Sequence, residues 1–238
     1  MTTLRTDSNT APLRPSDAIR LFAALFKRTG AAMITAPAGW GLKGWSTFSL
    51  FIISTSIAYL QKRPIEWVLL GDGREPVQTV AGIGSQFGGG TIVISVIVLA
   101  LVGGYIFKRS NAVEAGIALA VAGAWCGILS QVGQFILAEA RPLQGGAMAF
   151  FALDGHGVSG HAASSALLFW PIYNIWGRDS GKFKRALLGA ILMSWTAMVV
   201  WSRMWDGRHY LWNVMLGMGL GFSLGYNAVK EWGKIPPS

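Results

Sequence analysis

The sequence has little charge for its length. Of its 238 residues only 13% are charged, whereas 52% are hydrophobic, and soluble domains carry roughly 25% charged residues. This deficit excludes an ordinary soluble domain and places the chain among membrane proteins. The net charge of +9 does not indicate a nucleic-acid partner. The basic residues lie mainly in short segments between apolar runs, as they do in the cytoplasmic loops of membrane proteins.

Cysteine is nearly absent as well. The single cysteine, Cys126, lies within an apolar run, so it makes no intrachain disulfide and is interpreted as a packing residue. The sequence has no Cys/His spacing typical of a metal site, and we expect neither a metal nor another cofactor. The first forty residues also lack the continuous apolar core and the small-residue cleavage site of a signal peptide.

Long apolar runs, by contrast, are abundant. A spanning helix needs roughly 20 mostly apolar residues, and six segments reach or approach this length. Their bounds are Gly44–Leu60, Gly90–Phe107, Ala112–Leu137, Ala162–Trp176, Ala186–Trp201 and Leu211–Val229. The sequence therefore predicts an all-α polytopic membrane protein. It would consist of a six-transmembrane-helix bundle at residues 44–229, with cytoplasmic tails at residues 1–43 and 230–238.

The distribution of Lys and Arg predicts the orientation of this bundle. Most of them precede the first span, follow the last, or lie between spans two and three and spans four and five. Because basic residues are enriched in cytoplasmic loops, both termini are expected in the cytoplasm, with the chain in the inner membrane of the cell. Arg141, Arg203 and Arg208 then lie at the outer ends of helices, where positive charge requires a local reason.

Two segments outside the predicted spans are each open to two interpretations. Ser16–Arg28 combines a Ser N-cap with apolar and basic residues, which fits an amphipathic helix lying on the membrane as well as an ordinary tail. Residues 61–89 form the longest outer loop. They fit a lid or re-entrant hairpin, but a plain connector is the favoured interpretation.

The last predicted span has a glycine at every fourth position of one face. Gly217, Gly221 and Gly225 leave room for close helix packing in a membrane. The favoured interpretation is packing within the molecule, with dimerisation the less favoured one.

Histidine is scarce, but its placement is informative. His156, His161 and His209 all fall at the predicted outer surface, and three groups of polar residues accompany them there. The first group is Arg141-Pro142, just after the third span. Proline ends a helix, and arginine presents five donors in a rigid fork that suits phosphate oxygens. Anchoring to a lipid head group explains this pair equally well.

The second group, Gly157-Val158-Ser159-Gly160-His161, opens the fourth predicted span. The first turn of a helix offers unpaired N–H groups and the positive end of the dipole, so an anion can dock there. Glycine lets the backbone approach the anion closely. Ser159 would add a hydroxyl donor and His161 an acid or base. The alternative is a serine N-cap followed by a histidine satisfied within the fold.

The third group comprises Ser202-Arg203, His209 and Asn213. His209 and Asn213 are four residues apart, so they are expected to share a helix face and to hydrogen-bond. Such a partner fixes which ring nitrogen carries the proton. Arg203 would be a second phosphate ligand.

Together these groups resemble the type 2 phosphatidic acid phosphatase (PAP2) superfamily. The family pattern is Lys-x6-Arg-Pro, then Pro-Ser-Gly-His, then Ser-Arg-x5-His-x3-Asp. The order is the same here, and Ser159-Gly160-His161 and Ser202-Arg203-x5-His209 are intact. The resemblance is best from about Gln134 to Gly225. It implies a membrane lipid phosphatase with six helices.

The resemblance also implies roles for individual residues. His209 would attack phosphorus to form a phosphohistidine, and His161 would protonate the leaving lipid oxygen. No metal would be required, since phosphoryl transfer depends mainly on positioning and charge stabilisation. The implied partner is a phosphorylated lipid at the outer leaflet, and neither the particular lipid nor the oligomeric state can be derived from the sequence. The phosphoryl oxygens would be held by Arg141, Ser159, Arg203 and the N–H of Gly160.

Three positions depart from the family pattern: Gln134 replaces the lysine, Val158 the proline and Asn213 the aspartate. Gln134 can still donate a hydrogen bond but brings no charge. Asparagine cannot balance an imidazolium, and in a serine protease the comparable change costs roughly 10⁴-fold. Either another acid, Asp206 or Asp154, orients the nucleophilic histidine, or turnover is slow or lost.

Two other functions remain open. Gly157-Val158-Ser159-Gly160 and His209 also fit the outline of a rhomboid intramembrane protease, with Ser159 as nucleophile and His209 as its base. The arginines and His161 would then have no role. The other is a degenerate phosphatase that binds or moves lipid phosphates, for which Gln134 and Asn213 are the indications. A head-group transferase is a variant of the favoured function, because an alcohol can replace water. His156 and Asp154 have no counterpart in the family pattern. They could widen the polar network of the site or cap their loop, and the second is the favoured interpretation.

Overall fold

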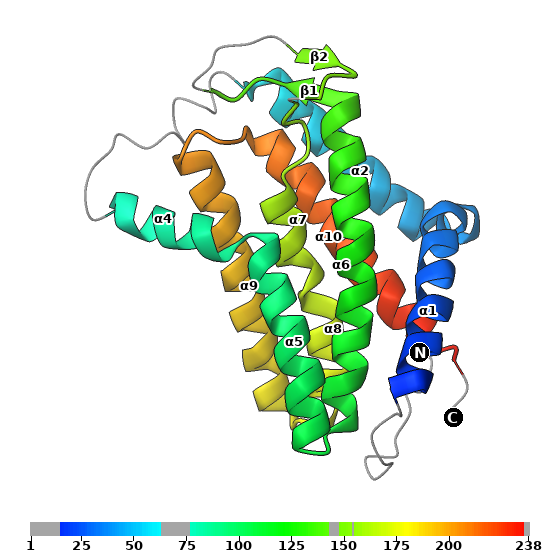
Figure 1. Cartoon of the computed structure of the whole chain (residues 1–238). Coiled ribbons are helices and arrows are strands. Elements are labelled where there is room, and N and C mark those ends of the chain that lie inside the picture. Colours follow the sequence, from blue (N-terminus) through cyan, green and yellow to red (C-terminus); the bar gives the residue numbers. More distant parts are fainter. Residues whose placement is uncertain (1–14, 63–76, 143–147, 154, 236–238) are drawn as a thin grey trace.

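The computed structural model describes residues 15–62, 77–142, 148–153 and 155–235, and in Figure 1 these form a bundle of helices with a small sheet at one end. The two short strands, β1 (Leu137–Glu139) and β2 (Met148–Phe150), pair antiparallel. In chain order the helices are α1 (Pro15–Thr35), η1 (Ala36–Gly39), α2 (Leu42–Leu60), α4 (Val77–Phe87), α5 (Gly90–Ile106), α6 (Ser110–Ile136), α7 (Gly160–Leu167), α8 (Phe169–Asn174), η3 (Trp176–Asp179), α9 (Lys182–Trp205) and α10 (Leu211–Trp232).

Each of the six predicted apolar segments is helical, but the fourth is divided. It forms α7 and α8, which meet at Leu168. Pro171 explains the division, because it lacks the N–H that would continue the hydrogen-bond ladder to the carbonyl of Leu167. The remaining five helices begin and end within a few residues of the predicted bounds.

The number of membrane spans predicted from the sequence is not confirmed. In the described part of the chain, α6 and α9 are long and apolar enough to cross a membrane, and α4 with α5, bent by 56°, qualifies as a third span. Neither α7, with 8 residues, nor α8, with 6, reaches spanning length on its own. The chain is therefore a mainly helical protein with two or three candidate spans by this criterion.

Large apolar side chains that face outward are concentrated on α2 and α5. In water such a surface would be unfavourable, because apolar area is stabilised by leaving water. Contact with lipid removes this cost, so the pattern agrees with a membrane environment for both helices. Those more than half exposed include Leu50, Ile53 and Ile57 on α2, and Ile94, Leu99 and Ile106 on α5.

Helices α7 and α10 pack closely through the glycines of α10. A Cβ atom at Gly217, Gly221 or Gly225 would lie 2.4, 2.2 or 2.6 Å from a backbone carbonyl oxygen of α7 or of its N-cap residue, Ser159. The two backbones approach to a distance that only glycine permits. The interpretation of this stripe as a contact within the molecule is confirmed.

Helix α1 packs against α6 and α10 and belongs to the bundle. Leu25 is completely buried. The indole nitrogen of Trp125 in α6 donates to the carbonyl oxygen of Phe26 at 3.0 Å, and its ring fills the space beside Gly30, where a Cβ would lie 2.3 Å away. A helix is thus present at Ser16–Arg28, and its residues Leu25 and Phe26 pack against other helices of the bundle.

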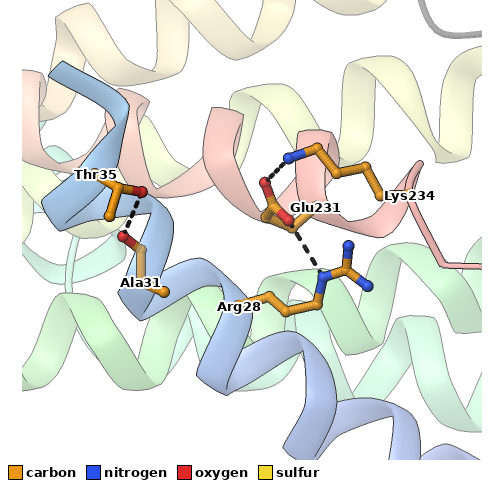
Figure 2. A network of polar contacts seen from close by, with 5 residues as sticks. All are labelled: Arg28, Ala31, Thr35, Glu231 and Lys234. Atoms are coloured by element: carbon orange, nitrogen blue, oxygen red, sulfur yellow. Dashed lines mark hydrogen bonds and ion pairs between the residues drawn. The ribbon is translucent and has the colours of Figure 1, made fainter. Parts of the chain in front are cut away.

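Polar contacts also join α1 to the end of α10 (Figure 2). Glu231, which is buried, accepts a hydrogen bond from Arg28 at 3.3 Å and pairs with Lys234 on its other oxygen. A buried carboxylate needs such partners, because an unpaired charge away from water is costly. This network joins α1, through Arg28, to the end of α10, on the side of the bundle away from β1 and β2 (Figure 1).

Candidate active site

The turn between α9 and α10 fixes Arg203 and His209 relative to each other. Gly207 adopts a positive φ of 61°, and its N–H donates to Met204 while that of Arg208 donates to Arg203, both at 3.0 Å. This is a Schellman motif, in which glycine provides the left-handed residue that ends a helix. The N–H of His209 donates to the same Arg203 carbonyl at 3.2 Å. The spacing of Ser-Arg-x5-His therefore corresponds to one helix end and its turn.

Asn213 does not orient His209. Its Oδ1 accepts from the N–H of Tyr210 at 2.8 Å, and its Nδ2 donates to the carbonyl of Gly157 at 2.9 Å. The prediction of a His209–Asn213 hydrogen bond is wrong. Helix α10 begins at Leu211, and residues four apart face each other only when both lie within a helix. Within the described residues, Nδ1 of His209 is buried without a hydrogen-bond partner.

Ser159 is the N-cap of α7, as the alternative interpretation of the second group proposed. It is completely buried, and its hydroxyl oxygen accepts from the N–H of Ala162 at 3.4 Å. Its own N–H donates to the carbonyl of Asn213 at 3.1 Å. Gly160 and His161 follow in the first turn of α7 and line a cavity.

The first group lies where α6 passes into β1. Gln134, in the last turn of α6, donates from Nε2 to the carbonyl of Val158 at 2.9 Å. Its amide therefore supports the segment that leads into α7, and Gln134 also lines the cavity. Arg141 follows β1 and lines the same cavity. The tertiary structure thus brings the three groups together.

Helix α4 contributes to the site, although its segment was interpreted as a plain connector. It packs against α9, and Ser85 accepts a hydrogen bond from the guanidinium of Arg203. At the α4–α5 junction, a Cβ at Gly89 would lie 3.3 Å from Nε2 of His161. The part of the loop at residues 63–76 lies outside the described residues. Ser85 was missed from the sequence, where only the surrounding glycines marked this segment.

The polar residues face one cavity of about 810 Å³. Along α6 its lining extends from Gln134 to Ala120, about 21 Å at 1.5 Å per residue. Polar residues line the end near the α9–α10 turn, and mainly small or apolar residues line the remainder. The polar set at this end is Gln134, Arg141, His156, His161, Arg203 and His209; the other lining residues include Phe22, Val93, Ile94, Ile97, Gly123, Ala124, Gly127 and Leu167, together with the polar Ser130, Gln131 and Ser164. Phe22 was not predicted as a member of the site, and for His156 this was the less favoured of two interpretations.

The environment of His209 favours a neutral imidazole. Burial, followed by the positive charge of Arg203, lowers the pKa of His209 to about 3. A neutral ring has a free lone pair at neutral pH, as a nucleophile requires. Neither proposed substitute acid is seen to orient it: the described contacts of Asp206 include no bond to His209 and leave its Oδ1 without a partner, and Asp154 lies outside the described residues. No three His, Cys, Asp or Glu side chains are grouped for metal binding in the described ranges.

Two comparisons with known proteins agree with this arrangement. The family model described as the PAP2 superfamily matches residues 111–234. The solved structure described as "the first transmembrane PAP2 type phosphatidylglycerolphosphate phosphatase from Bacillus subtilis" aligns with a TM-score of 0.54 and 16% identity, covering 92% of this chain and 97% of that one. At this identity the likeness concerns the fold. Among curated proteins, none matches the sequence significantly.

Proposed function

This chain belongs to the PAP2 superfamily, and from that premise we propose that it is a membrane lipid phosphatase that removes a phosphate group from a phosphorylated lipid. The observation that carries the proposal is the cavity. At one end it gathers imidazole and guanidinium groups, and over the rest of its length it is mainly apolar. Phosphoryl transfer needs such positioned positive charge.

The apolar wall favours a lipid over a soluble phosphate ester. A soluble ester would need only the polar end, whereas a lipid also places a hydrocarbon chain, which gains by leaving water. The wall formed by α5, α6 and Phe22 of α1 provides about 21 Å of length for this chain. Phosphatidate, phosphatidylglycerol phosphate, a polyprenyl diphosphate and lipid A phosphate all have this combination of groups.

The proposed reaction has two steps. A ring nitrogen of neutral His209 attacks phosphorus, and a P–N bond forms as the P–O bond to the lipid breaks. His161 in its protonated form, which the negative charge of a bound phosphate favours, gives its proton to the leaving oxygen, and then, as a base, takes one from the water that cleaves the phosphohistidine. Arg141, Arg203 and the N–H of Gly160 stabilise the charge on the phosphoryl oxygens. General acid catalysis of this kind contributes about 10²–10⁴-fold.

Topology completes the proposal. The Lys and Arg distribution supports a site at the outer face of the inner membrane, with both termini in the cytoplasm. The first group of the family pattern lacks its lysine, and the remaining cationic groups suit a phosphomonoester. The reaction as written uses only side chains and the backbone of this chain, and is proposed to be independent of metal.

The structure weakens the two competing functions. In a rhomboid-type protease Ser159 would be an accessible nucleophile, but its hydroxyl is buried and caps α7. For a degenerate phosphatase, the chief indication was Asn213. This side chain bonds to the backbone of both Gly157 and Tyr210. The asparagine at position 213 therefore has a structural role in this fold, and its presence does not by itself indicate loss of activity. A head-group transferase stays a variant of the proposal.

The test is phosphate release by the detergent-purified protein, with EDTA present, from a panel of the four lipid phosphates named above. The proposal expects release by the wild type, loss of at least about 10³-fold in His209→Ala and His161→Ala, and full release by Ser95→Ala. Ser95 is an exposed position on α5 whose hydroxyl bonds within its own helix. Absence of release by the wild type from every lipid would contradict the proposal. Release that EDTA abolishes would contradict its metal independence.

A further inference from the structure

The backbone on both sides of His156 is held tightly against neighbouring elements. A Cβ at Gly155 would lie 2.2 Å from the carbonyl oxygen of Gln134, and one at Gly157 would lie 1.7 Å from that of Leu137. No side chain fits at either position, so the two glycines let this loop lie directly on the end of α6 and on β1. The direction of the Cα–Cβ bond of His156 is therefore set by backbone packing on both sides.

The strand beneath this loop is itself fixed. The N–H of His156 donates to the carbonyl of Glu139 in β1 at 3.2 Å. The carboxylate of Glu139 is buried, pairs with Lys62, two residues beyond the end of α2, and accepts from the indole nitrogen of Trp212 at 2.9 Å. Lys62 and Trp212 thus hold the strand that supports His156. An unpaired polar group within such a buried network would destabilise the fold.

The imidazole of His156 faces the polar end of the cavity. Its ring centroid lies 6.4 Å from that of His209, and the two planes are at 88°. Arg141, His161 and Arg203 line the same end. At this separation the rings are not hydrogen-bonded to each other, and a phosphoryl group attached to His209 would bring one of its oxygens within reach of His156.

Gln134 leaves a donor position open at this end. Its Nε2 is committed to the carbonyl of Val158, and its side chain has no charge. A phosphoryl group has three non-bridging oxygens to be stabilised. His156 and Gln131 are further cavity-lining side chains with donor nitrogens to which the mechanism above gives no role, and His156 is the one whose ring lies 6.4 Å from that of His209.

We propose that His156 is a further substrate-binding residue, which donates a ring N–H to a non-bridging oxygen of the phosphoryl group. The proposal rests on the proposed function for the identity of the natural ligand, and it specifies how this site holds the phosphate. It replaces the earlier interpretation of His156 as a loop cap. No covalent bond is made or broken at His156, and the two reaction steps proposed above are unchanged.

The test compares His156→Gln with His156→Leu, two side chains of similar size of which only the first keeps an N–H donor. The probe is inorganic phosphate, whose binding to the purified protein is followed by ³¹P NMR. Leu153→Ala, at a 96% exposed position of the same loop, is the matched control, and thermal unfolding of each variant shows whether it folds.

The expected result is a dissociation constant for phosphate that rises about tenfold to hundredfold in His156→Leu, rises less than about threefold in His156→Gln, and is unchanged in Leu153→Ala. Equal affinity in His156→Leu and the wild type would overturn the proposal, and so would equal losses in the Gln and Leu variants. Phosphate binding needs no turnover. Absence of lipid hydrolysis in the wild type would therefore count against the proposed function while leaving this comparison valid.

Discussion

The amide nitrogen of Asn213 donates a hydrogen bond to the carbonyl oxygen of Gly157 at 2.9 Å. The carbonyl of Asn213 in turn accepts from the N–H of Ser159 at 3.1 Å. Through these two bonds the start of α10 is joined to the start of α7. The segments that carry His161 and His209 are therefore held together by Asn213, which is a positioning residue and makes no bond to either ring among the described contacts.

Asn213→Asp is expected to impair the protein, although it restores the residue of the family pattern. One carboxylate oxygen still accepts from Tyr210, but the other would face the carbonyl oxygen of Gly157 in place of a donor. We expect a loss of about 1–3 kcal/mol in the free energy of unfolding together with reduced lipid phosphatase activity.

The matched control for this prediction is Asn227→Asp in the same helix. Asn227 also donates to a backbone carbonyl, that of Ser223 at 2.9 Å, but it lies away from the cavity. Denaturation and phosphate-release assays measure the stability and the activity of both variants. The control should lose stability while keeping its activity. Higher activity in Asn213→Asp than in the wild type would show that position 213 can orient His209 after all.

His209 makes stability depend on pH. It lies in the turn outside the helices, and burial lowers its pKa to about 3, below the value of about 6.5 in an unfolded chain. Between these values the unfolded state binds more protons, so the stability contributed by neutral His209 is complete above pH 6.5 and is lost as the pH falls toward 3. Thermal unfolding from pH 4.5 to 7 should show a steeper acid loss in the wild type than in His209→Gln. Equal slopes would contradict the pKa shift.

Ser85→Ala should weaken substrate binding without abolishing turnover. The hydroxyl of Ser85 accepts from the guanidinium of Arg203, whose Nε is buried without a partner among the described contacts. Losing this restraint should raise KM by about 2–10-fold, corresponding to 0.5–1.5 kcal/mol for one hydrogen bond, with a smaller effect on kcat. Ser95→Ala on α5 removes a serine hydroxyl that bonds only within its own helix and should leave both constants unchanged. An unchanged KM in Ser85→Ala would show that α4 does not position Arg203.

Gly221→Ala should destabilise the bundle, while Gly103→Ala should not. The added methyl at position 221 would lie 2.2 Å from the carbonyl oxygen of Ala163, whereas nothing lies within 4 Å of a Cβ at position 103. Overpacking typically costs about 1–3 kcal/mol, and an unhindered Gly-to-Ala change in a helix gains up to about 1 kcal/mol. Denaturation of the two variants in the same detergent measures the difference. Equal stability would mean that α7 and α10 can separate without cost.

Phe22→Ala should change the preferred length of the lipid chain, if the proposed function holds. Phe22 is the residue of α1 that lines the cavity, and its removal enlarges the apolar part. We expect kcat/KM for long-chain substrates to rise relative to short-chain ones. Phe183→Ala, at an 80% exposed position on α9, is the control. An unchanged preference in Phe22→Ala would place the lipid chain elsewhere.

The helices and the order of the polar groups could be predicted from the sequence, because both depend on local information. An apolar run of spanning length forms a helix whatever it packs against, and helix is found at all six segments. The glycine stripe of α10 was also interpreted correctly, since a small residue at every fourth position has the same geometric meaning in any helix. The contact between His209 and Asn213 was predicted wrongly. Helix α10 begins at Leu211, as the sequence predicted, so His209 lies outside the helix and the four-residue relation does not apply to it.

The sequence by itself determined a helical membrane protein of the PAP2 type, with His161, His209, Arg141 and Arg203 as the candidate chemistry. Only the tertiary structure decided what the neighbouring polar side chains do. Ser159 and Asn213 hydrogen-bond to the backbone around the site. Ser85 contacts Arg203, and His156 lines the cavity. The physical reason is that these roles depend on partners far along the chain, such as the 56 residues between Gly157 and Asn213 and the 118 between Ser85 and Arg203. No local pattern of residue types specifies such distances.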